Sequence, residues 1–544
     1  MTYFFIFYII IKLKNLFLRR TIFDNLIITI ALPYSNGNIH LGHLLEAVQA
    51  DIFNRYKKLS GCNTIFVSGN DAHGSAISIK ANQEGITPEE LISKIQKAHH
   101  RDYKKFQVDF DHFGTTHTET NKNNIHKFFN NNRNLFKEKE IKQLFDEEKN
   151  QFLSDRYVIG ECPECHAKDQ YGDGCEVCGK QYSASELINP VSKLSNTKPI
   201  LKNTTQIFYD TNHFREKILD WLNNTNIQNS VKNKLKEWLN KPLKEWDISR
   251  EAPYFGFQIP EYDNKFFYVW IDAPIGYISI VEEYLKQNNL DIDIWNKNSN
   301  YSLHQFIGKD VVNYHGIYWI SELLGFDYIL PESITTHGFL TINNEKISKS
   351  KGNYLEAKDF ELPPESLRYY YASKLTNSIE DLNLDTNEIK EVFNNKLVGG
   401  FVNLGSRIIK ILEKNFNSKI GSEIDYDFLN SFKCQYNNIL DNYENKNFRN
   451  VISEIENIIY QTNAYINKKE PWLLVKSNKN EALIICNTVL NIFFKLSILL
   501  EPIIPEVSKS IYALFNKDNL SFKNIKENIQ NLKLNNYQHL LKRI

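Results

Sequence analysis

The chain has 544 residues, of which 42% are hydrophobic and 24% are charged, an ordinary composition for a globular protein. A chain of this length is too long for one hydrophobic core, so we expect three or four domains. Lysine plus arginine equals aspartate plus glutamate, at 65 each, so a generally basic surface is excluded and any nucleic-acid site must be a local basic face. The seven cysteines include two tight pairs, a pattern that favours a metal site over a disulfide framework.

The N-terminus begins with an apolar run over residues 3–11, followed by basic residues up to Arg20. A secretory signal carries its charge before the apolar run, and a membrane span needs about 20 apolar residues, so neither fits. We interpret residues 1–23 as an N-terminal extension outside the fold, with a peripheral membrane anchor as the alternative. No other segment is expected to reach transmembrane length, so we expect no membrane partner and a cytoplasmic protein.

Strands and helices alternate from residue 26 onward. Residues 26–32 (LIITIAL) form a continuous apolar run typical of a buried parallel strand, and a helical pattern covers about 40–59. A second strand is predicted at 63–67 and another helix from Ser75, and Thr87-Pro88-Glu89-Glu90 marks a helix start with Thr as the N-cap. This order predicts an α/β fold with a doubly wound, Rossmann-type parallel sheet.

The alternation stops near Glu138, and a polar, cysteine-containing stretch continues to about Asp263. Strand-like runs resume at 265–271 and 305–307, and from about Asn394 the chain has the pattern of successive helices. We therefore predict an α/β domain that is split by an insertion and followed by an α-helical domain. The predicted boundaries are 24–137 and 265–338 for the halves of the α/β domain, 138–264 for the insertion, 339–393 for a following region, 394–535 for the helical domain and 536–544 for a tail.

The first motif with chemical significance is His40-Leu41-Gly42-His43, where the first strand meets its helix. Ligands of a doubly wound fold bind beyond the carboxyl ends of the strands, where free N–H groups of helix N-termini face anions. Gly42 allows a flat ring to approach the backbone closely. Two histidines three residues apart share a helix face, so both can donate hydrogen bonds to the same phosphates. Taken alone, such a pair is more often structural.

The second motif is Lys346-Ile347-Ser348-Lys349-Ser350, followed by Lys351-Gly352. Lysines on a loop can close over a leaving pyrophosphate and neutralise the charge that develops during displacement at an α-phosphorus. Taken alone, a run of lysine and serine is usually a solvated loop.

Together the two motifs resemble the HIGH and KMSKS signatures of class I aminoacyl-tRNA synthetases, with Leu41 and Ile347 as substitutions that keep an apolar side chain. The flanking sequences are similar to the methionyl-tRNA synthetase family from about Asp24 to the C-terminus. The segments that carry this resemblance are ALPY at 31–34, NDAHG at 70–74, WDISR at 246–250, APYFG at 252–256, YVWIDAPIGY at 268–277 and FIGKD at 306–310. The resemblance implies a ligase that activates L-methionine with ATP and transfers it to the 3′-terminal adenosine of initiator and elongator methionine tRNAs.

The resemblance also implies which residues bind ATP and methionine. The catalytic groups would be His40, His43, Lys346 and Lys349; ATP, with Mg²⁺, would also contact Gly42, Lys309, Asp310 and Ser348. Asp71 would pair with the methionine ammonium. The thioether would lie among apolar and aromatic side chains, with which sulfur makes favourable contacts; these are Leu32, Tyr34, Trp270, Ala273, Pro274, Tyr277, Tyr314, His315 and Trp319. Tyr314 stands where the family commonly has Phe, and any single aromatic of this set could instead be core.

Cys162 and Cys165 form one CxxC pair and Cys175 and Cys178 a second, with nine residues between the pairs. Four thiolates at this spacing predict a closed tetrahedral site for one structural Zn²⁺, with no open position for catalysis. The metal would organise the insertion and act on catalysis only by placing the tRNA acceptor end. A loop of free thiols is the alternative.

The resemblance assigns the helical region to anticodon binding and residues 339–393 to contact with the tRNA stem. Asn403 and Arg407 lie four residues apart on one predicted helix face, and Pro471-Trp472 begins another helix. Bases of single-stranded loops stack on aromatic side chains, and the resemblance maps these four residues to the CAU anticodon, with Trp472 as the stacking platform. The tail at 536–544 would pack on the catalytic domain. No appended dimerising domain is recognised, so we expect a monomer.

Two alternatives remain at this point. Another class I synthetase, for leucine, isoleucine, valine or cysteine, is disfavoured because the aliphatic enzymes carry a much larger editing insertion and the cysteine enzyme has zinc in its amino-acid pocket. A non-enzymatic tRNA-binding paralogue is disfavoured because both phosphate motifs are intact.

Overall fold

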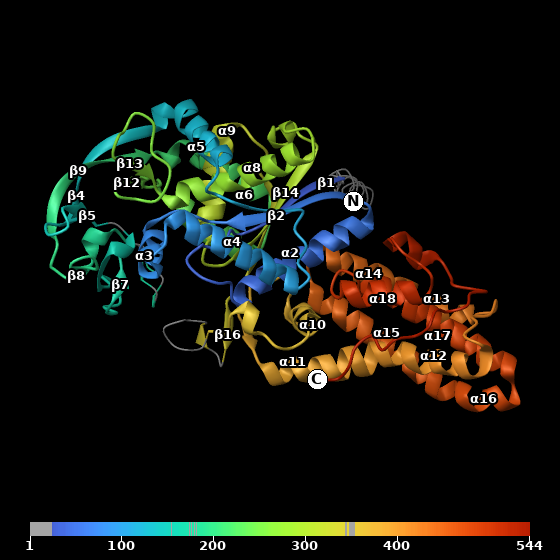
Figure 1. Cartoon of the computed structure of the whole chain (residues 1–544). Coiled ribbons are helices and arrows are strands. Elements are labelled where there is room, and N and C mark those ends of the chain that lie inside the picture. Colours follow the sequence, from blue (N-terminus) through green and yellow to red (C-terminus); the bar gives the residue numbers. More distant parts are fainter. Residues whose placement is uncertain are drawn as a thin grey trace, which may run out of the picture.

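The computed structural model describes residues 24–153, 155–172, 182–342, 345–346 and 354–544, together with 174, 175, 177, 178 and 180. The extension predicted at 1–23 lies outside these residues, as do Ser348 and Lys349 of the lysine motif. In Figure 1 the α/β part occupies the upper half of the molecule, and the helices of the C-terminal region extend below it.

Six parallel strands form the central sheet, in the order β10-β15-β14-β1-β2-β3. The strands are β1 (Asn25–Ile30), β2 (Asn63–Asn70), β3 (His112–Thr115), β10 (Asn226–Ile227), β14 (Tyr301–Gly308) and β15 (Pro331–His337). β1 pairs with β2 on one side and with the distant β14 on the other, so the winding direction reverses there, which is where doubly wound folds bind ligands. The predicted fold class is confirmed.

Helices cover both faces of this sheet: α2 (Leu41–Ser60), α3 (Ser75–Glu84), α4 (Pro88–Lys105), α5 (Glu119–Asn131), α8 (Val269–Gln287) and α9 (Trp319–Phe326). Ile28 and Ile30 of β1 join the core beneath α2, whereas Ile27 joins the core beneath α8, as the two-residue period of a strand requires. Thr87 and Glu90 form the predicted capping box at the start of α4.

The strand predicted at 265–271 is wrong beyond Phe267. β13 (Lys265–Phe267) ends there, pairs with β12 (Ser249–Glu251) outside the central sheet, and is followed at once by α8. A short continuous apolar run does not distinguish a strand from a buried helix. The second half of this run is the first turn of α8.

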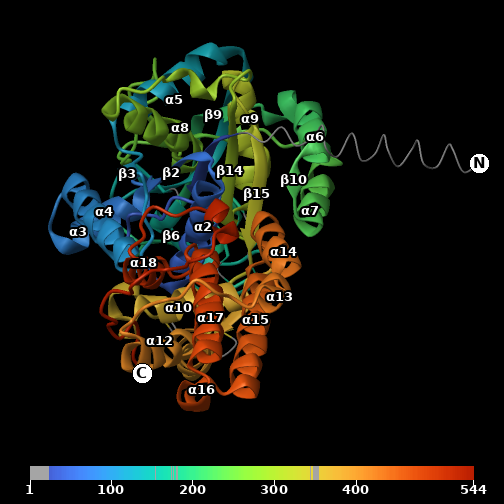
Figure 2. The same cartoon turned by 90° about the vertical axis from the view of Figure 1, so that its right-hand side faces the viewer.

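The insertion consists mainly of antiparallel sheet, drawn at the left of Figure 1. Its strands are β4 (Phe136–Asp146), β5 (Gln151–Phe152), β9 (Ile200–Tyr209) and β11 (Trp246–Asp247) in one sheet, and β6 (Val158–Glu161), β7 (Gln170–Tyr171) and β8 (Ile188–Ser192) in a second. β10 falls within 138–264 but pairs with β15, and α6 (Arg215–Asn224) and α7 (Asn229–Leu239) flank it at the sheet edge (Figure 2). The stretch predicted as one insertion therefore also supplies an edge of the catalytic sheet. A two-residue strand has no periodicity by which it could be found.

A small sheet of β16 (Leu340–Ile342), β17 (Glu345–Lys346) and β18 (Leu382–Leu384) carries the start of the lysine motif. After it come α10 (Pro364–Lys374), α11 (Thr386–Val392) and a π-helical segment (Phe393–Val402). The remaining helices are α12 (Asn403–Phe416), α13 (Tyr426–Asn430), α14 (Lys433–Glu444), α15 (Phe448–Lys469), α16 (Pro471–Ser477), α17 (Lys479–Leu500) and α18 (Pro505–Leu514). The hydrogen bonds of the tail join Ile544 to Asn394 in the π-helical segment, whereas the sequence predicted packing on the catalytic domain.

The expectation that no further segment reaches transmembrane length is wrong for α17, which is long and apolar enough to cross a bilayer by length and composition. Nearly all of this helix is buried inside the protein, among α12, α15, α16 and α18. Its polar residues bond within the core: Lys495 donates to the Ile525 carbonyl at 2.5 Å, and Asn491 donates to the Ile529 carbonyl at 3.0 Å. The apolar character of α17 is therefore explained by its position in the helical core.

Arg368 of α10 joins the two parts of the molecule and is completely buried. Its guanidinium donates to Asp51 Oδ2 of α2 at 2.7 Å, and to the carbonyls of Pro502 and Ile503, which link α17 to α18, at 2.9 and 2.7 Å. Asp51 also accepts from Arg55 at 2.8 Å. A buried charge needs such partners because desolvation is costly. The helix that follows the HLGH motif is thereby tied to the C-terminal helices.

Candidate active site

The HLGH motif forms the N-terminus of α2, with His40 as the N-cap. His40 Nδ1 accepts the Gly42 N–H at 3.0 Å, and His43 Nδ1 accepts the His40 N–H at 3.1 Å. Since each Nδ1 is an acceptor, the proton of each neutral ring lies on Nε2. The ring centroids of His40 and His43 lie 3.9 Å apart, so their two Nε2–H donors lie close together.

The packing around Gly42 explains why this position has no side chain, which the sequence alone did not show. A Cβ at this position would lie 2.7 Å from His40 Cε1 and 2.9 Å from its Nδ1, which is closer than real contacts allow. Any larger residue would therefore displace the ring that caps α2. The predicted role, close approach of an adenine ring, remains compatible with this packing.

The described residues on both sides of the lysine motif meet the HLGH segment. Before the motif, Leu340 Cβ lies 3.8 Å from where a Cβ on Gly42 would stand. After it, the Leu41 N–H donates to the Leu355 carbonyl at 3.3 Å, and the Tyr354 ring lies 5.4 Å from that of His40. Lys346, the first residue of the motif, lies in β17, which pairs with the strand that contains Leu340. The described flanks of the lysine motif thus lie beside the HLGH segment, although the two motifs are some 300 residues apart in sequence.

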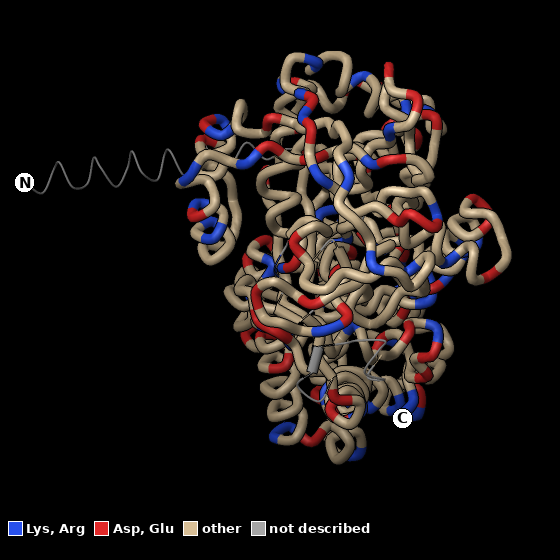
Figure 3. The backbone as a smooth tube through the Cα atoms, turned by 90° about the vertical axis from the view of Figure 1, so that its left-hand side faces the viewer, with Lys and Arg blue, Asp and Glu red and all other residues tan. Residues whose placement is uncertain are grey.

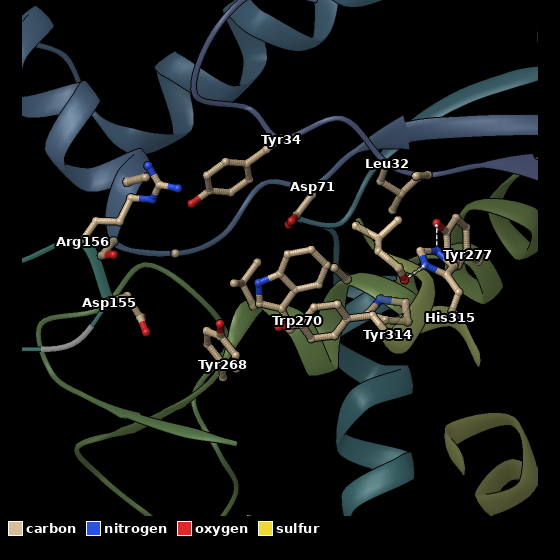
Figure 4. Close-up of a pocket in the computed structure, with 18 of the residues that line it drawn as sticks. Leu32, Tyr34, Asp71, Asp155, Arg156, Tyr268, Trp270, Tyr277, Tyr314 and His315 are labelled. Atoms are coloured by element: carbon tan, nitrogen blue, oxygen red, sulfur yellow. Dashed lines mark hydrogen bonds between the residues drawn. The ribbon is translucent and has the colours of Figure 1, made fainter. Parts of the chain in front are cut away.

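Next to this junction lies a cavity at the carboxyl end of β1, shown in Figure 4. Of the ten residues predicted to bind methionine, all except Trp319 line it. The lining residues are Ala31, Leu32, Tyr34, Asp71, Gly74, Ser75, Ala76, Asp155, Arg156, Tyr254, Tyr268, Val269, Trp270, Ala273, Pro274, Tyr277, Val311, Tyr314 and His315. Tyr277, His315 and Leu32 close one end, whereas Tyr34, Asp155 and Arg156 lie at the other.

Asp71 lies between these ends and is 8% exposed. Burial, and then the nearby charge of Asp272, raise the pKa of its carboxyl well above the usual value. Its Oδ1 accepts no hydrogen bond within the described residues. A buried carboxylate oxygen without a donor fits a cationic ligand group, such as an ammonium, that would satisfy it on binding.

The apolar end contains one hydrogen-bonded pair whose direction can be assigned. His315 Nδ1 lies 3.0 Å from the Val311 carbonyl, which can only accept, so Nδ1 carries the proton. Nε2 then accepts from the Tyr277 hydroxyl at 2.9 Å. Burial lowers the pKa of His315 to about 4, so the ring is neutral near pH 7. This end of the cavity therefore holds no charge.

Two aromatic rings cover one side of the cavity, because Trp270 stacks on Tyr314 with centroids 4.0 Å apart. Trp319 does not reach the cavity. It is fully buried behind Tyr277, its ring 5.6 Å away, and its indole N–H donates to Gln305 Oε1 at 2.8 Å. The prediction that Trp319 lines the cavity is thus incorrect, because Trp319 packs behind Tyr277.

The predicted ATP contacts Lys309 and Asp310 follow the end of β14. Lys309 is paired with Asp381 at 2.5 Å, and its ammonium lies 4.3 Å from the centre of the Phe339 ring. In the same region Glu46, three residues after His43 in α2, accepts from His337 at 3.2 Å. Glu46 was missed by the sequence analysis, although its spacing from His43 places it on the same helix face.

The four cysteines predicted to bind zinc come together, with all Sγ atoms within 4.8 Å of one another. Cys162 and Cys178 lie 3.8 Å apart, and Cys165 and Cys175 3.5 Å apart. The Cys165 N–H points at Cys162 Sγ and the Cys178 N–H at Cys175 Sγ, at 3.5 and 3.3 Å, which stabilises thiolates. The cluster is compatible with a structural zinc site.

The predicted anticodon residues come from two helices that meet. Arg407 of α12 places its guanidinium 5.5 Å from the ring centre of Trp472, the second residue of α16. Trp472 is 38% exposed and Asn403 is also exposed, while Pro471 is buried. An exposed indole beside an arginine can stack a base.

Comparison with known proteins identifies the class of enzyme. The model of the family described as "tRNA synthetases class I (M)" matches residues 26–409, and that of the "Anticodon binding domain of methionyl tRNA ligase" matches 419–538. The chain belongs to the class I methionyl-tRNA synthetases. Members of this family activate methionine with ATP and charge tRNA with it.

Solved structures agree with this fold. Mycobacterium tuberculosis methionyl-tRNA synthetase in complex with methionyl-adenylate has a TM-score of 0.78 and 19% identity, covering 95% of this chain and 99% of that one. The apo form of the same organism's enzyme has a TM-score of 0.72 and 18% identity, with 96% and 98% covered. At these identities the likeness concerns the fold.

Sequence reasoning missed the residues that the insertion brings to the methionyl-tRNA synthetase cavity. Arg250 forms a bidentate pair with Asp155, at 3.1 Å from Nη2 to Oδ1 and from Nε to Oδ2, and lies 3.7 Å from the centre of the Tyr268 ring. Arg156 lines the cavity beside them. Arg250 stood in the WDISR segment that carried the resemblance, but Asp155 and Arg156 lie in a polar stretch without any motif.

Proposed function

We propose that methionine binds with its ammonium on Asp71 and its thioether at the end closed by Tyr277 and His315. The neutral, apolar end suits the thioether, and the stacked Trp270 and Tyr314 rings offer sulfur–aromatic contact. The buried Asp71 supplies a carboxylate that can pair with the ammonium. With two of its three groups so held, the methionine carboxylate points toward the end that Tyr34 and Arg156 line.

Activation joins this carboxylate to ATP. A carboxylate oxygen attacks the α-phosphorus, the bond to pyrophosphate breaks, and methionyl-adenylate forms. His40 and His43 donate from Nε2 to the phosphates, and Lys346 and Lys349 neutralise the leaving pyrophosphate. Mg²⁺ bound to ATP would supply further charge neutralisation. No covalent enzyme intermediate is needed, because positioning and charge stabilisation lower the barrier.

The second step transfers methionine to tRNA. The 2′-hydroxyl of the terminal adenosine attacks the carbonyl of methionyl-adenylate and gives up its proton, and AMP leaves with the electrons of the broken bond. Asn403, Arg407, Pro471 and Trp472 would select the CAU anticodon of initiator and elongator tRNAs at the far end. One Zn²⁺ on the four cysteines would hold the small sheet of the insertion in shape. We further propose that the enzyme acts as a monomer in the cytoplasm.

The observation that carries this proposal is the meeting of both flanks of the lysine motif with HLGH, beside the cavity that contains Asp71. Methionine-dependent exchange of pyrophosphate into ATP tests it directly. We expect exchange with methionine and little with leucine, isoleucine, valine or cysteine. Absence of exchange with methionine would refute the proposal, and a stronger signal with another amino acid would reassign the substrate.

The lysine motif gives a second test. Lys349→Ala should lower the activation rate by several orders of magnitude and leave methionine affinity almost unchanged, because Lys349 would contact the leaving group only. An equal loss of affinity and rate would contradict that role.

A further inference from the structure

Asn38, in the loop between β1 and α2, is bonded to the segment that follows the lysine motif. Its side-chain amide donates from Nδ2 to Glu356 Oε2 at 2.6 Å, and its backbone carbonyl accepts from the Tyr354 hydroxyl at 2.9 Å. We call these two bonds the Asn38 contact. None of the three residues belongs to the predicted sites, and none has a role in the proposed reaction.

The backbone beside the Asn38 contact is paired as well. His40 and Glu356 form an antiparallel bridge, and the Ala357 N–H donates to the Ile39 carbonyl at 3.0 Å. Ala357 is fully buried, so this pairing is shielded from water. The segment that follows the lysine motif is therefore fixed along the residues that lead into α2.

The loop that carries Asn38 is itself fixed to the α/β core. His99 of α4 is 1% exposed, and its Nε2 donates to the Gly37 carbonyl at 2.7 Å. Nδ1 of the neutral ring then accepts from the Asn70 amide at 2.7 Å. Asn70 is the last residue of β2 and directly precedes Asp71. The strand that presents Asp71 to the methionine cavity therefore also holds the loop at Asn38.

Long-range charge is a poor alternative means of placing the lysine motif. Blue and red alternate along the described chain on the face in Figure 3, as expected for 65 basic and 65 acidic residues, so these charges form no broad field of one sign. Glu356 also pairs with Lys358 at 2.9 Å, but the Lys358 side chain is 46% exposed, so solvent screens that ion pair. Hydrogen bonds are directional, so the Asn38 contact specifies a position.

We infer that Asn38, Tyr354 and Glu356 are positioning residues for the activation step. Their bonds fix the end of the lysine motif relative to the histidine pair of HLGH, and a lysine must be in place when charge develops on the leaving pyrophosphate. This inference rests on the proposed function, because only in that reaction do the lysines and the histidines meet one triphosphate. The three side chains act through the lysines, so they affect the rate of activation and leave methionine affinity unchanged.

Pyrophosphate exchange, measured over ranges of methionine and ATP concentration, tests the inference. Asn38→Ala and Glu356→Ala should each lower kcat by about ten- to hundredfold, the loss expected when a reacting group is displaced by roughly 1 Å. KM for methionine should stay within about twofold of the wild-type value, because an interaction made only in the transition state changes kcat alone. Tyr354→Phe loses one neutral hydrogen bond and should lower kcat by about two- to tenfold. Glu356→Gln keeps an acceptor for the Asn38 amide and should recover most of the rate.

Two controls separate positioning from a general loss of structure. Lys358→Ala removes the other partner of Glu356 and leaves the Asn38 contact in place, so kcat should not change. The double variant with alanine at both Asn38 and Glu356 should be no slower than either single variant, because both lose the same bond. Thermal unfolding checks that each variant is folded; if an alanine variant is not, Tyr354→Phe carries the test, and an unchanged kcat there would overturn the inference.

The remaining outcomes are equally clear. Full activity of both alanine variants, additive losses in the double variant, or a rise in methionine KM as large as the fall in kcat would each overturn the inference. An equal loss of rate in Glu356→Gln and Glu356→Ala would do so as well, since the glutamine keeps the hydrogen bond. Failure of the proposed function is visible separately, as absent exchange in the wild type.

Discussion

Asp71→Asn is the substitution whose consequences the structure defines most fully. The change keeps the shape of the side chain but removes the charge that, in the proposed function, pairs with the methionine ammonium. Asp71 is buried, its Oδ1 has no donor among the described residues, and its pKa is raised by burial and by Asp272. Ionisation of this carboxyl is therefore unfavourable in the free enzyme, and we expect a bound ammonium to make it favourable.

The expected loss of affinity follows from the cost of a broken buried pair. Removing one partner of such a pair costs about 3–5 kcal/mol, and since about 1.4 kcal/mol is tenfold, methionine should bind on the order of 150- to 5,000-fold more weakly. The assay is pyrophosphate exchange over a range of methionine concentrations. KM for ATP should stay near the wild-type value. A change in methionine KM of less than about tenfold would refute the assignment.

The same substitution should stabilise the free enzyme, with a defined pH dependence. The folded pKa of Asp71 lies above its ordinary value of 3.8, so the unfolded state loses this proton first as pH rises. The wild type therefore loses stability relative to Asp71→Asn as pH rises above about 4, until the folded pKa is passed. Thermal unfolding between pH 5 and 9 measures this difference. A variant that is less stable than the wild type at pH 8 would contradict the buried-charge reasoning.

Three further perturbations have simple expected outcomes. Removal of zinc with a chelator, or Cys175→Ala, should abolish one bound metal per chain in elemental analysis and reduce tRNA charging more than pyrophosphate exchange, because the cysteine cluster lies in the insertion. Trp472→Ala should weaken tRNA binding by about 1–3 kcal/mol through lost base stacking and leave exchange unchanged; a matched change at exposed Tyr460 should have no such effect. Arg368→Met should lower the free energy of unfolding by about 3 kcal/mol in denaturant titration, because among the described residues Asp51 then keeps Arg55 as its one cationic partner, beside the Asp109 N–H; a loss below 1 kcal/mol would show that the pair is not needed.

The sequence predicted the fold well where one local rule decides the structure. The alternation of apolar runs and amphipathic helices placed β1, α2, β2 and α3 within a few residues, and the capping box at Thr87 fixed the start of α4. It failed where two rules conflict or none applies. The apolar run at 265–271 suits a strand and a buried helix equally, and β10 is too short to show any period.

For the site, motifs showed which residues meet but not how they bond. The cavity contains nearly all the predicted methionine residues, but Trp319 lies behind Tyr277, because an apolar side chain beside a pocket and one in its wall look alike in sequence. Asp155 and Arg156 were missed since their importance depends on how the insertion folds back over α3. The proton positions of His40 and His315 follow from backbone partners and need coordinates.

The buried Arg368 contact ties the helix that begins at HLGH to the helices of the C-terminal region. α2 carries His40 and His43 at its N-terminus and Asp51 farther along, and Arg368 binds Asp51 and the α17–α18 link at once. One continuous hydrophobic core runs from β1 and α2 through α10 to α15 and α17. Densely packed cores transmit displacement and do not bend freely. The helix that begins at HLGH and the helices against which α16 packs thus share one packed core. If the proposed roles hold, an anticodon loop seated at Trp472 would therefore set how far the rest of the tRNA lies from the methionine cavity.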